Sequence, residues 1–481
     1  MKTIKYFLIG ALMTVISAPA MAQVSVADAI KAIKSSNASN AKETEKLVKQ
    51  AYKAVKKDAA EVSKLGRAYL DVKDTLNARV YAELAIKANK KSALGYILRG
   101  DIEVLNDNPG EAASWYQNAI YFDPQNPEAY KKYAFIYRGR DPKQAVQTLE
   151  QLRTVDPTYP VDAEAGHIYY LSATKNAAYM PLALEHFQKV QLPDYDRLGS
   201  YYMTEYALVA FASQKNDLSK QIAEFGLKKN PRNAGYNRLA LYNSVELKDF
   251  DSAIKYVDLL FNKSDSLEVT ANDYKFAALA FAGAKNYDEA INYYTKQLEL
   301  AEGNEAKAVV LKSISDVYRE KGDLENALAK YEEYLNINPS TSANDYASYA
   351  NIYRNMAAEQ TGEAQAASVN KALEIYKTLI EKFPTSADYS NFMSARTIQI
   401  LDPDQKKGLA RPYYEAIVKS IETAGIKNDT DKIRVKEAYS YLGIYYFKIA
   451  NDSATAKPYF DKLIELDPEN EIAKQVLSTY K

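Results

Sequence analysis

The chain has 481 residues, of which 47% are hydrophobic and 26% are charged, and this composition is typical of folded proteins rather than disordered ones. Lysine plus arginine and aspartate plus glutamate both number 62, and this balance argues against a nucleic-acid-binding protein and against a polybasic protein of membrane surfaces. The absence of cysteine excludes disulfides, thiol chemistry and a lipid-anchored cysteine.

The N-terminal stretch predicts an export signal. Lys2 and Lys5 precede an apolar run over residues 6–16, and Ala-Met-Ala at residues 20–22 forms a small-residue cleavage site before Gln23. The apolar run is too short to cross a bilayer, so we interpret residues 1–22 as a secretory signal peptide cleaved after Ala22. The alternative is an N-terminal anchor that stays in place. With cleavage, we expect a periplasmic or exported protein with no integral membrane segment.

Two segments with helical periodicity follow, over residues 25–34 and 42–57. In the second segment Leu47, Ala51 and Val55 form a narrow apolar stripe, and lysines occupy much of the remaining surface. We predict a helical pair here.

A short pattern then recurs along the chain, in which an alanine is followed four residues later by a large side chain. The pairs are Ala112/Tyr116, Ala145/Leu149, Ala183/Phe187, Ala253/Val257, Ala290/Tyr294, Ala327/Tyr331, Ala372/Tyr376 and Ala410/Tyr414. A small residue precedes many pairs, as at Gly66 and Gly100, and an Asp-Pro or Asn-Pro dipeptide follows many of them. The separation from Gly66 to Gly100 is 34 residues.

Close packing of two helices explains these offsets. A glycine or alanine lets two helix backbones approach, and the large side chain four residues later fills the space beside the contact. Proline cannot continue a helix and so ends the unit, while the preceding Asp or Asn favours a turn. No single helical pair buries its apolar face alone, so neighbouring units must stack.

The pattern resembles the tetratricopeptide repeat, a helix–turn–helix unit of about 34 residues. The resemblance covers nearly all of the chain after residue 22, in about eleven units. We place the unit starts near residues 59, 93, 127, 160, 200, 234, 271, 308, 343, 387 and 436. The resemblance implies an all-α fold, an α-solenoid coiled into a right-handed superhelix whose first helices line a concave groove.

These units divide the chain into five predicted segments. They are a signal peptide (1–22), a degenerate repeat or cap helices (23–57), a regular array (58–342), irregular repeats with insertions (343–435), and a last repeat with a capping helix (436–481). One insertion, of about ten residues around 359–368, is of the kind that solenoid loops tolerate. We therefore expect long loops within 355–435.

No catalytic or metal-binding motif competes with this interpretation. The two histidines, His167 and His186, lie beside apolar helical residues, where a packing role is the simpler explanation. Motifs of metalloproteases, serine hydrolases, dinucleotide-binding proteins and phosphate-binding loops are absent. We predict no enzyme, no catalytic residue, no metal and no cofactor.

The resemblance implies a non-enzymatic protein–protein interaction scaffold, which the signal peptide would place in the bacterial cell envelope. Protein or peptide partners would bind in the concave groove. The predicted partner-binding residues occupy groove positions and are Lys131, Phe135, Arg138, His167, Tyr170, Tyr201, Phe211, Lys312, Arg319 and Arg354. The basic and aromatic residues from Lys131 to Phe211 favour a peptide with acidic and apolar groups. The alternative is that they are ordinary exposed solenoid residues.

Two narrower functions fit less well. One branch of the family grips the C-terminal carboxylate of a chaperone, but Phe135 stands where that clamp has asparagine and Ala347 stands where it has lysine. The other is a carbohydrate-binding envelope protein on the same scaffold. That class typically has a lipid-anchor cysteine and long insertions outside the repeats, which this sequence lacks.

Overall fold

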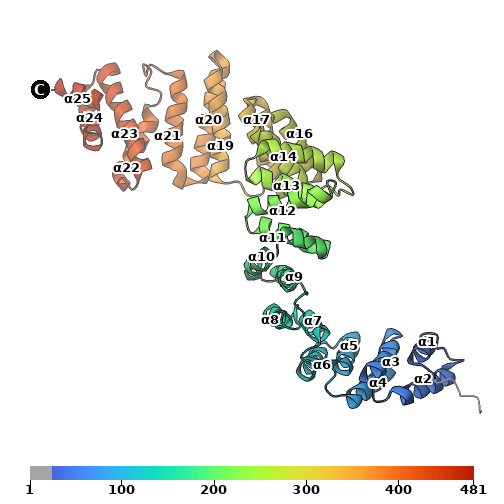
Figure 1. The fold of residues 1–481 in the computed structure, drawn as a ribbon. Helices are drawn as coiled ribbons and strands as arrows, with labels where there is room; N and C mark the ends of the chain where they lie inside the picture. Colours follow the sequence, from blue (N-terminus) through green and yellow to red (C-terminus); the bar gives the residue numbers. More distant parts are fainter. Residues whose placement is uncertain (1–23, 481) are drawn as a thin grey trace, which may run out of the picture. The chain divides into compact units, whose positions relative to one another are not determined.

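The computed structural model describes residues 24–480, and these residues form an all-α fold as predicted (Figure 1). The predicted signal peptide lies outside the described residues. None of the described helices combines the length and the hydropathy that crossing a membrane requires. The packed helices form two units, and the boundary in the chain lies between Lys229 and Asn230; each unit is described separately below.

Unit 1 contains helices α1 to α12. Their bounds are α1 (Val26–Lys34), α2 (Ala41–Val55), α3 (Ala59–Asp71), α4 (Thr75–Ala88), α5 (Ala93–Leu105), α6 (Pro109–Phe122), α7 (Pro127–Tyr137), α8 (Pro142–Leu152), α9 (Val161–Ala173), η1 (Ala177–Tyr179), α10 (Met180–Gln188), η2 (Leu192–Arg197), α11 (Ser200–Ala212) and α12 (Asn216–Lys229). Helix α3 packs against its hairpin partner α4 and also against α1 and α5, the first helices of the neighbouring pairs.

Unit 2 contains helices α13 to α25. Their bounds are α13 (Ala234–Glu246), α14 (Phe250–Asp258), η3 (Leu259–Lys263), α15 (Ala271–Gly283), α16 (Tyr287–Leu300), α17 (Gly303–Lys321), α18 (Leu324–Ile337), α19 (Ala343–Glu359), α20 (Gly362–Lys382), η4 (Pro384–Ser386), α21 (Ala387–Ile398), η5 (Gln399–Leu401), α22 (Arg411–Ala424), α23 (Asp429–Ile444), η6 (Tyr445–Ile449), α24 (Ser453–Leu466) and α25 (Glu471–Ser478). Here α13 packs against α14 and α15, which repeats the arrangement seen in unit 1.

The first helices of the predicted repeats begin where the pattern places them, with two exceptions. Helix α17 begins at Gly303 rather than at 308, and α23 begins at Asp429 rather than at 436. Both helices open with several polar residues that precede the repeat pattern, so the pattern does not mark their first turn. Asn428 caps the longer start of α23 by accepting a hydrogen bond from the N–H of Asp431.

The hairpin of α17 and α18 shows how the repeated residues act. Gly322 adopts a left-handed conformation, with φ of 85°, and ends α17. Asp323 caps α18, and Ala327 is fully buried where the two helices meet. Tyr331 fills the space beside this contact, and its hydroxyl donates to the backbone carbonyl of Asp345 at 3.1 Å.

The predicted core positions are confirmed. The alanines of the repeated pairs are buried, and so are their partners Tyr116, Phe187, Tyr294, Tyr331, Tyr376 and Tyr414. At Gly100 a Cβ atom would lie 2.3 Å from the ring of Tyr116, so this glycine is required by the close approach of α5 and α6. The equivalent Gly443 faces Phe460 with slightly more room, at 2.9 Å.

The expectation of long loops within 355–435 is wrong at the insertion around 359–368. Helix α19 continues to Glu359 and α20 begins at Gly362, so the extra residues lengthen two helices. Gly362 has a φ of 63°, which allows a tight reversal. The side-chain amide of Gln365 donates to the carbonyls of Ala357 and Gln360, satisfying groups at the end of α19.

Candidate functional site

A row of exposed apolar side chains follows the first helices of unit 1. The row consists of Leu94 and Val104 on α5, Phe135 on α7, Leu171 on α9 and Tyr201 on α11. Phe135 is 55% exposed. Single exposed apolar residues are ordinary, and Leu76 on α4 and Tyr121 on α6 are exposed too, but recurrence on the first helices α5, α7, α9 and α11 makes this face a candidate interaction surface. We call it the first-helix face of unit 1.

Two pockets lie along this face. The α3–α7 pocket has a volume of about 440 Å³ and is lined by Leu94, Ile97 and Leu98 together with charged residues of α3 and α7. The α5–α9 pocket has a volume of about 360 Å³, and Val104 and Phe135 contribute to its apolar wall. Apolar walls with a few convergent polar groups are the usual composition of binding sites.

A third pocket, the turn pocket, lies between the α7–α8 turn and the C-terminal end of α9. Its volume is about 390 Å³. It is lined by Arg138, Gly139, Arg140, Pro142, Ile168, Leu171, Ser172, Lys175, Asn176 and Tyr179. Leu171 therefore belongs both to the apolar row and to this pocket.

A satisfied carboxylate lies at the base of the α5–α9 pocket. Asp101 is almost fully buried, accepts a hydrogen bond from the hydroxyl of Tyr116 at 2.6 Å and forms ion pairs with Arg67 and with Lys132, the latter at 3.0 Å. Burial, followed by the charge of Asp101, raises the pKa of Tyr116, which stays a neutral hydrogen-bond donor. These contacts join α3, α5, α6 and α7. Because Asp101 already has three partners, it does not require a ligand to balance its charge.

The structure brings together three of the predicted residues, all near α7. The guanidinium of Arg138 lies 3.8 Å from the ring centre of Phe135, a cation–π arrangement. Lys131 lies 3.1 Å from Asp156 and 4.5 Å from the ring centre of Tyr159. Since Phe135 lines the α5–α9 pocket and Arg138 lines the turn pocket, this contact makes the two pockets adjacent.

Family models described as tetratricopeptide repeat match residues 63–127, 269–340 and 437–470. All three stretches contain first and second helices joined by the short turns described above. The chain is a tetratricopeptide repeat protein. Such repeats form protein-interaction scaffolds with extended binding surfaces, and the matched models indicate no enzyme family.

Several solved structures are similar to this repeat protein. The C-terminal part of a TPR repeat-containing protein from Cytophaga hutchinsonii has 21% identity and a TM-score of 0.46, over 57% of this chain and 99% of that one. A tetratricopeptide repeat protein from Parabacteroides merdae has 17% identity and a TM-score of 0.31, over 54% and 98%. YrrB, described as a TPR protein with an unusual peptide-binding site, has 14% identity and a TM-score of 0.31, over 44% and 97%. No curated protein matches the chain.

The remaining predicted residues of unit 1 lie on α9 and α11. His167 is half-buried, and its Nδ1 lies 2.8 and 2.9 Å from the two carboxylate oxygens of Glu205, so the pair joins one repeat to the next. The ring of Tyr201 lies 5.2 Å from that of His167. Tyr170 and Phe211 are half-buried, and burial raises the pKa of Tyr170.

The last three predicted residues, Lys312, Arg319 and Arg354, belong to unit 2. They are therefore not part of the group on α7 to α11. Lys312 pairs with Asp345 at 2.7 Å and Arg319 with Asp316 at 2.7 Å, while the Nε of Arg354 is buried without a hydrogen-bond partner among the described residues. Burial alone would raise the pKa of Asp345, but hydrogen bonds, first that from Lys312, outweigh burial and hold this pKa at about 2.

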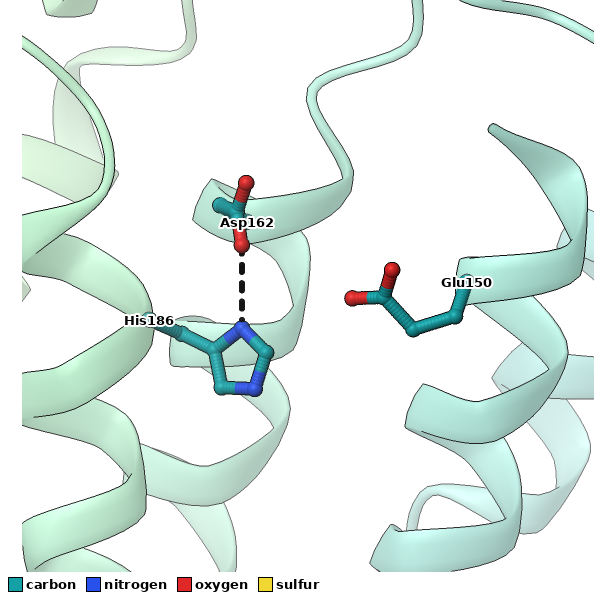
Figure 2. A group of neighbouring side chains, drawn as sticks. All are labelled: Glu150, Asp162 and His186. Atoms are coloured by element: carbon teal, nitrogen blue, oxygen red, sulfur yellow. Dashed lines mark hydrogen bonds and ion pairs between the residues drawn. The ribbon is translucent and has the colours of Figure 1, made fainter. Parts of the chain in front are cut away.

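Glu150, Asp162 and His186 converge from α8, α9 and α10, with ligand atoms close enough together for a metal ion (Figure 2). Their charges are already matched, however. Nδ1 of His186 lies 3.1 Å from Asp162, and Arg153 reaches both carboxylates, at 2.5 Å from Glu150 and 2.8 Å from Asp162. A hydrogen bond with Glu150 is the main cause that raises the pKa of Arg153. Because a metal would have to displace this arginine, the cluster is best described as an ion-pair network joining three helices.

Several residues of the first-helix face and its pockets were not predicted from the sequence, among them Leu94, Val104, Arg140 and Lys175. Leu94 and Val104 lie on α5, and both are substantially exposed. Arg140 and Lys175 lie outside regular α-helices, in the turn after α7 and just after α9. The sequence did contain a local indication of a basic turn, because Arg138 and Arg140 flank Gly139.

Proposed function

We propose that this repeat protein is an exported scaffold of the bacterial cell envelope that binds protein or peptide partners on the first-helix face of unit 1. The observation that carries the proposal is the exposed apolar row beside three adjoining hollows. Interfaces of this type derive most of their affinity from a few apolar and aromatic anchors in pockets. Phe135, Leu171 and Tyr201 are such anchors.

The charges beside these anchors favour a partner that is both acidic and apolar. Lys131 and Arg138 flank Phe135 on or just after α7, and Arg138 keeps no ion pair with a described carboxylate. A partner carboxylate next to an apolar side chain would match both features of the surface. An extended or a helical peptide would suit a groove formed by parallel rows of helices.

Capture of partners from an envelope extract tests this proposal. Replacing Lys131, Arg138 and Tyr201 together with alanine should reduce recovery of bound proteins strongly and leave the far-ultraviolet circular dichroism unchanged, since all three side chains are partly or largely exposed. A matched control replaces Lys143, Arg197 and Tyr121, which line none of the three pockets, with alanine. Equal recovery with the first variant and with the unaltered protein would contradict the proposal.

Export has its own test. The basic residues, apolar run and Ala-Met-Ala sequence of residues 1–22 support cleavage after Ala22. Cell fractionation followed by N-terminal sequencing should find a periplasmic or released protein beginning at Gln23. A cytoplasmic protein that retains residues 1–22 would contradict this part of the proposal.

A further inference from the structure

The turn pocket differs in charge from its surroundings. Three cationic side chains, Arg138, Arg140 and Lys175, line it, and no carboxylate does. Among residues 24–480, none of the three forms an ion pair. Other cations on the neighbouring helices are paired: Lys132 pairs with Asp101 at 3.0 Å and Arg153 with Asp162 at 2.8 Å.

The one carboxylate of the same turn is already engaged. Asp141 caps α8, and its Oδ1 accepts a hydrogen bond from the N–H of Gln144 at 3.0 Å. It does not line the pocket. The turn therefore presents cations to the pocket and directs its carboxylate to the helix terminus.

The remainder of the lining is apolar at one end. Ile168 is fully buried, Pro142 is buried, and Leu171 is 43% exposed. Such a pocket can hold an anionic group against its guanidinium groups while a neighbouring apolar group covers Leu171. Its contact with Phe135 through Arg138 connects it to the rest of the first-helix face.

We propose that the turn pocket is an oxyanion subsite for an acidic peptide, in which the carboxylate or phosphate group of one peptide residue meets Arg138, Arg140 and Lys175 and an adjacent apolar side chain packs on Leu171. This subsite lies in the hairpin turn and at the end of the next first helix rather than on the groove floor. The inference rests on the proposed function, because it assigns one contact of a partner bound to the first-helix face.

Selection from a phage library of random peptides tests the subsite on the full chain. Four proteins are compared: the unaltered protein, the R138Q/R140Q/K175Q variant, the R140Q/K175Q variant, and the control E325Q/E359Q, which neutralises carboxylates in unit 2. The R140Q/K175Q variant, which keeps the contact between Arg138 and Phe135, guards against misfolding of the triple variant. Far-ultraviolet circular dichroism establishes that every variant is folded.

On the unaltered protein and on the control, we expect enriched peptides to carry aspartate or glutamate next to an apolar residue. On R138Q/R140Q/K175Q the acidic enrichment should disappear while the apolar preference persists. For one enriched peptide, Kd measured by fluorescence anisotropy should rise about tenfold or more in the triple variant, as expected for lost charge-assisted hydrogen bonds. The same loss should follow from replacing its glutamate with glutamine.

A version of the peptide with phosphoserine in place of glutamate compares the two oxyanions, and the tighter binder identifies the group that the subsite prefers. Equal acidic enrichment on the unaltered protein and on the triple variant would overturn the subsite and leave the first-helix face standing. Equal affinity for the glutamate and glutamine peptides would overturn it as well. If no peptide is enriched on the unaltered protein, the proposed function itself fails and the subsite fails with it.

Discussion

The turn pocket of unit 1 has a counterpart of opposite charge in unit 2. Both pockets lie between the turn of one helical hairpin and the C-terminal end of the next first helix, and their volumes are about 390 and 340 Å³. The first contains two arginines and a lysine, whereas the second contains Asp323, Glu325 and Glu359 and no cation. The repeat geometry thus creates the hollow, and the residues outside the repeat pattern determine which ligand it suits.

The apolar surroundings of the two pockets differ as well. Leu171 in unit 1 is exposed, and the exposed Phe135 lies on the adjoining part of the face. In unit 2, Leu324 of the acidic pocket is buried, because it closes the α17–α18 hairpin. A partner that needs both a charge contact and an apolar anchor should therefore prefer unit 1.

The largest expected effect concerns the ion pair of Lys312 and Asp345 in unit 2. Asp345→Asn should lower the stability of unit 2 at pH 7 by about 2 kcal/mol, an upper value that follows from the depressed pKa. A carboxyl with a lowered pKa stabilises the fold above its ordinary pKa of 3.8, and this stabilisation is lost as the pH falls toward about 2. The deficit in the urea midpoint should accordingly vanish between pH 4 and pH 2.

Asp156→Asn is the control in unit 1, since the side chain of Asp156 is 22% exposed and that of Asp345 only 5%. It should shift the midpoint much less. Equal midpoints for the two variants at pH 7 would contradict the contrast between a buried carboxylate in unit 2 and a more solvated carboxylate in unit 1.

The helix contacts of the two units should also differ in their tolerance of a methyl group. Gly100→Ala places a Cβ atom 2.3 Å from the ring of buried Tyr116 and should destabilise unit 1 by about 1–2 kcal/mol, the overpacking cost less the helix preference for alanine. Gly443→Ala, at 2.9 Å from Phe460, should change stability by less than about 1 kcal/mol. Urea denaturation followed by circular dichroism measures both, and a larger loss for Gly443→Ala would reverse the prediction.

Two substitutions compare how much an exposed apolar residue of each unit contributes to peptide affinity. Phe135→Ala should weaken an enriched peptide about tenfold, because an aromatic anchor and its contact with Arg138 are both removed. Val309→Ala removes a residue that is 63% exposed on α17, a first helix of unit 2, and should leave Kd unchanged. Fluorescence anisotropy gives both values. A stronger effect of Val309→Ala would move the binding surface to unit 2.

The smallest expected effect is a gain in affinity for acidic peptides. Replacing Glu325 and Glu359 with arginine gives the acidic pocket of unit 2 a basic lining, and acidic peptides should then bind it weakly, with less than about a tenfold improvement over background. The gain stays small because no exposed apolar anchor comparable to Leu171 lines that pocket. Affinity equal to that of unit 1 would show that charge alone accounts for binding.

The fold was predictable because the residues that specify it are local in sequence. Ala327 and Tyr331 lie four residues apart, so their common face follows from helix geometry alone. The hairpin turns were harder to predict from the sequence. Positive φ is usually signalled by glycine, but here it is adopted by Lys73, Asp107, Gln214, Lys248 and Lys285.

The candidate site was predicted only in part, because its properties depend on contacts between repeats. Lys131, Phe135 and Arg138 were found from their groove positions, but the partners of Lys312 and His167 lie 33 and 38 residues further along the chain. Comparing charged residues one repeat apart would have revealed these pairs. The solvent exposure of Leu94 and Val104 depends on how neighbouring helices stack, which no single helix encodes.

Hydrogen–deuterium exchange of the full chain, with and without an enriched acidic peptide, tests the central claim most directly. The account predicts slower amide exchange in α7, in the turn containing Arg138 and Arg140, and in the C-terminal half of α9, with no change around Gly322 in unit 2. Slower exchange confined to unit 2, or to the second helices α6 and α8, would contradict the assignment of partner binding to the first-helix face of unit 1.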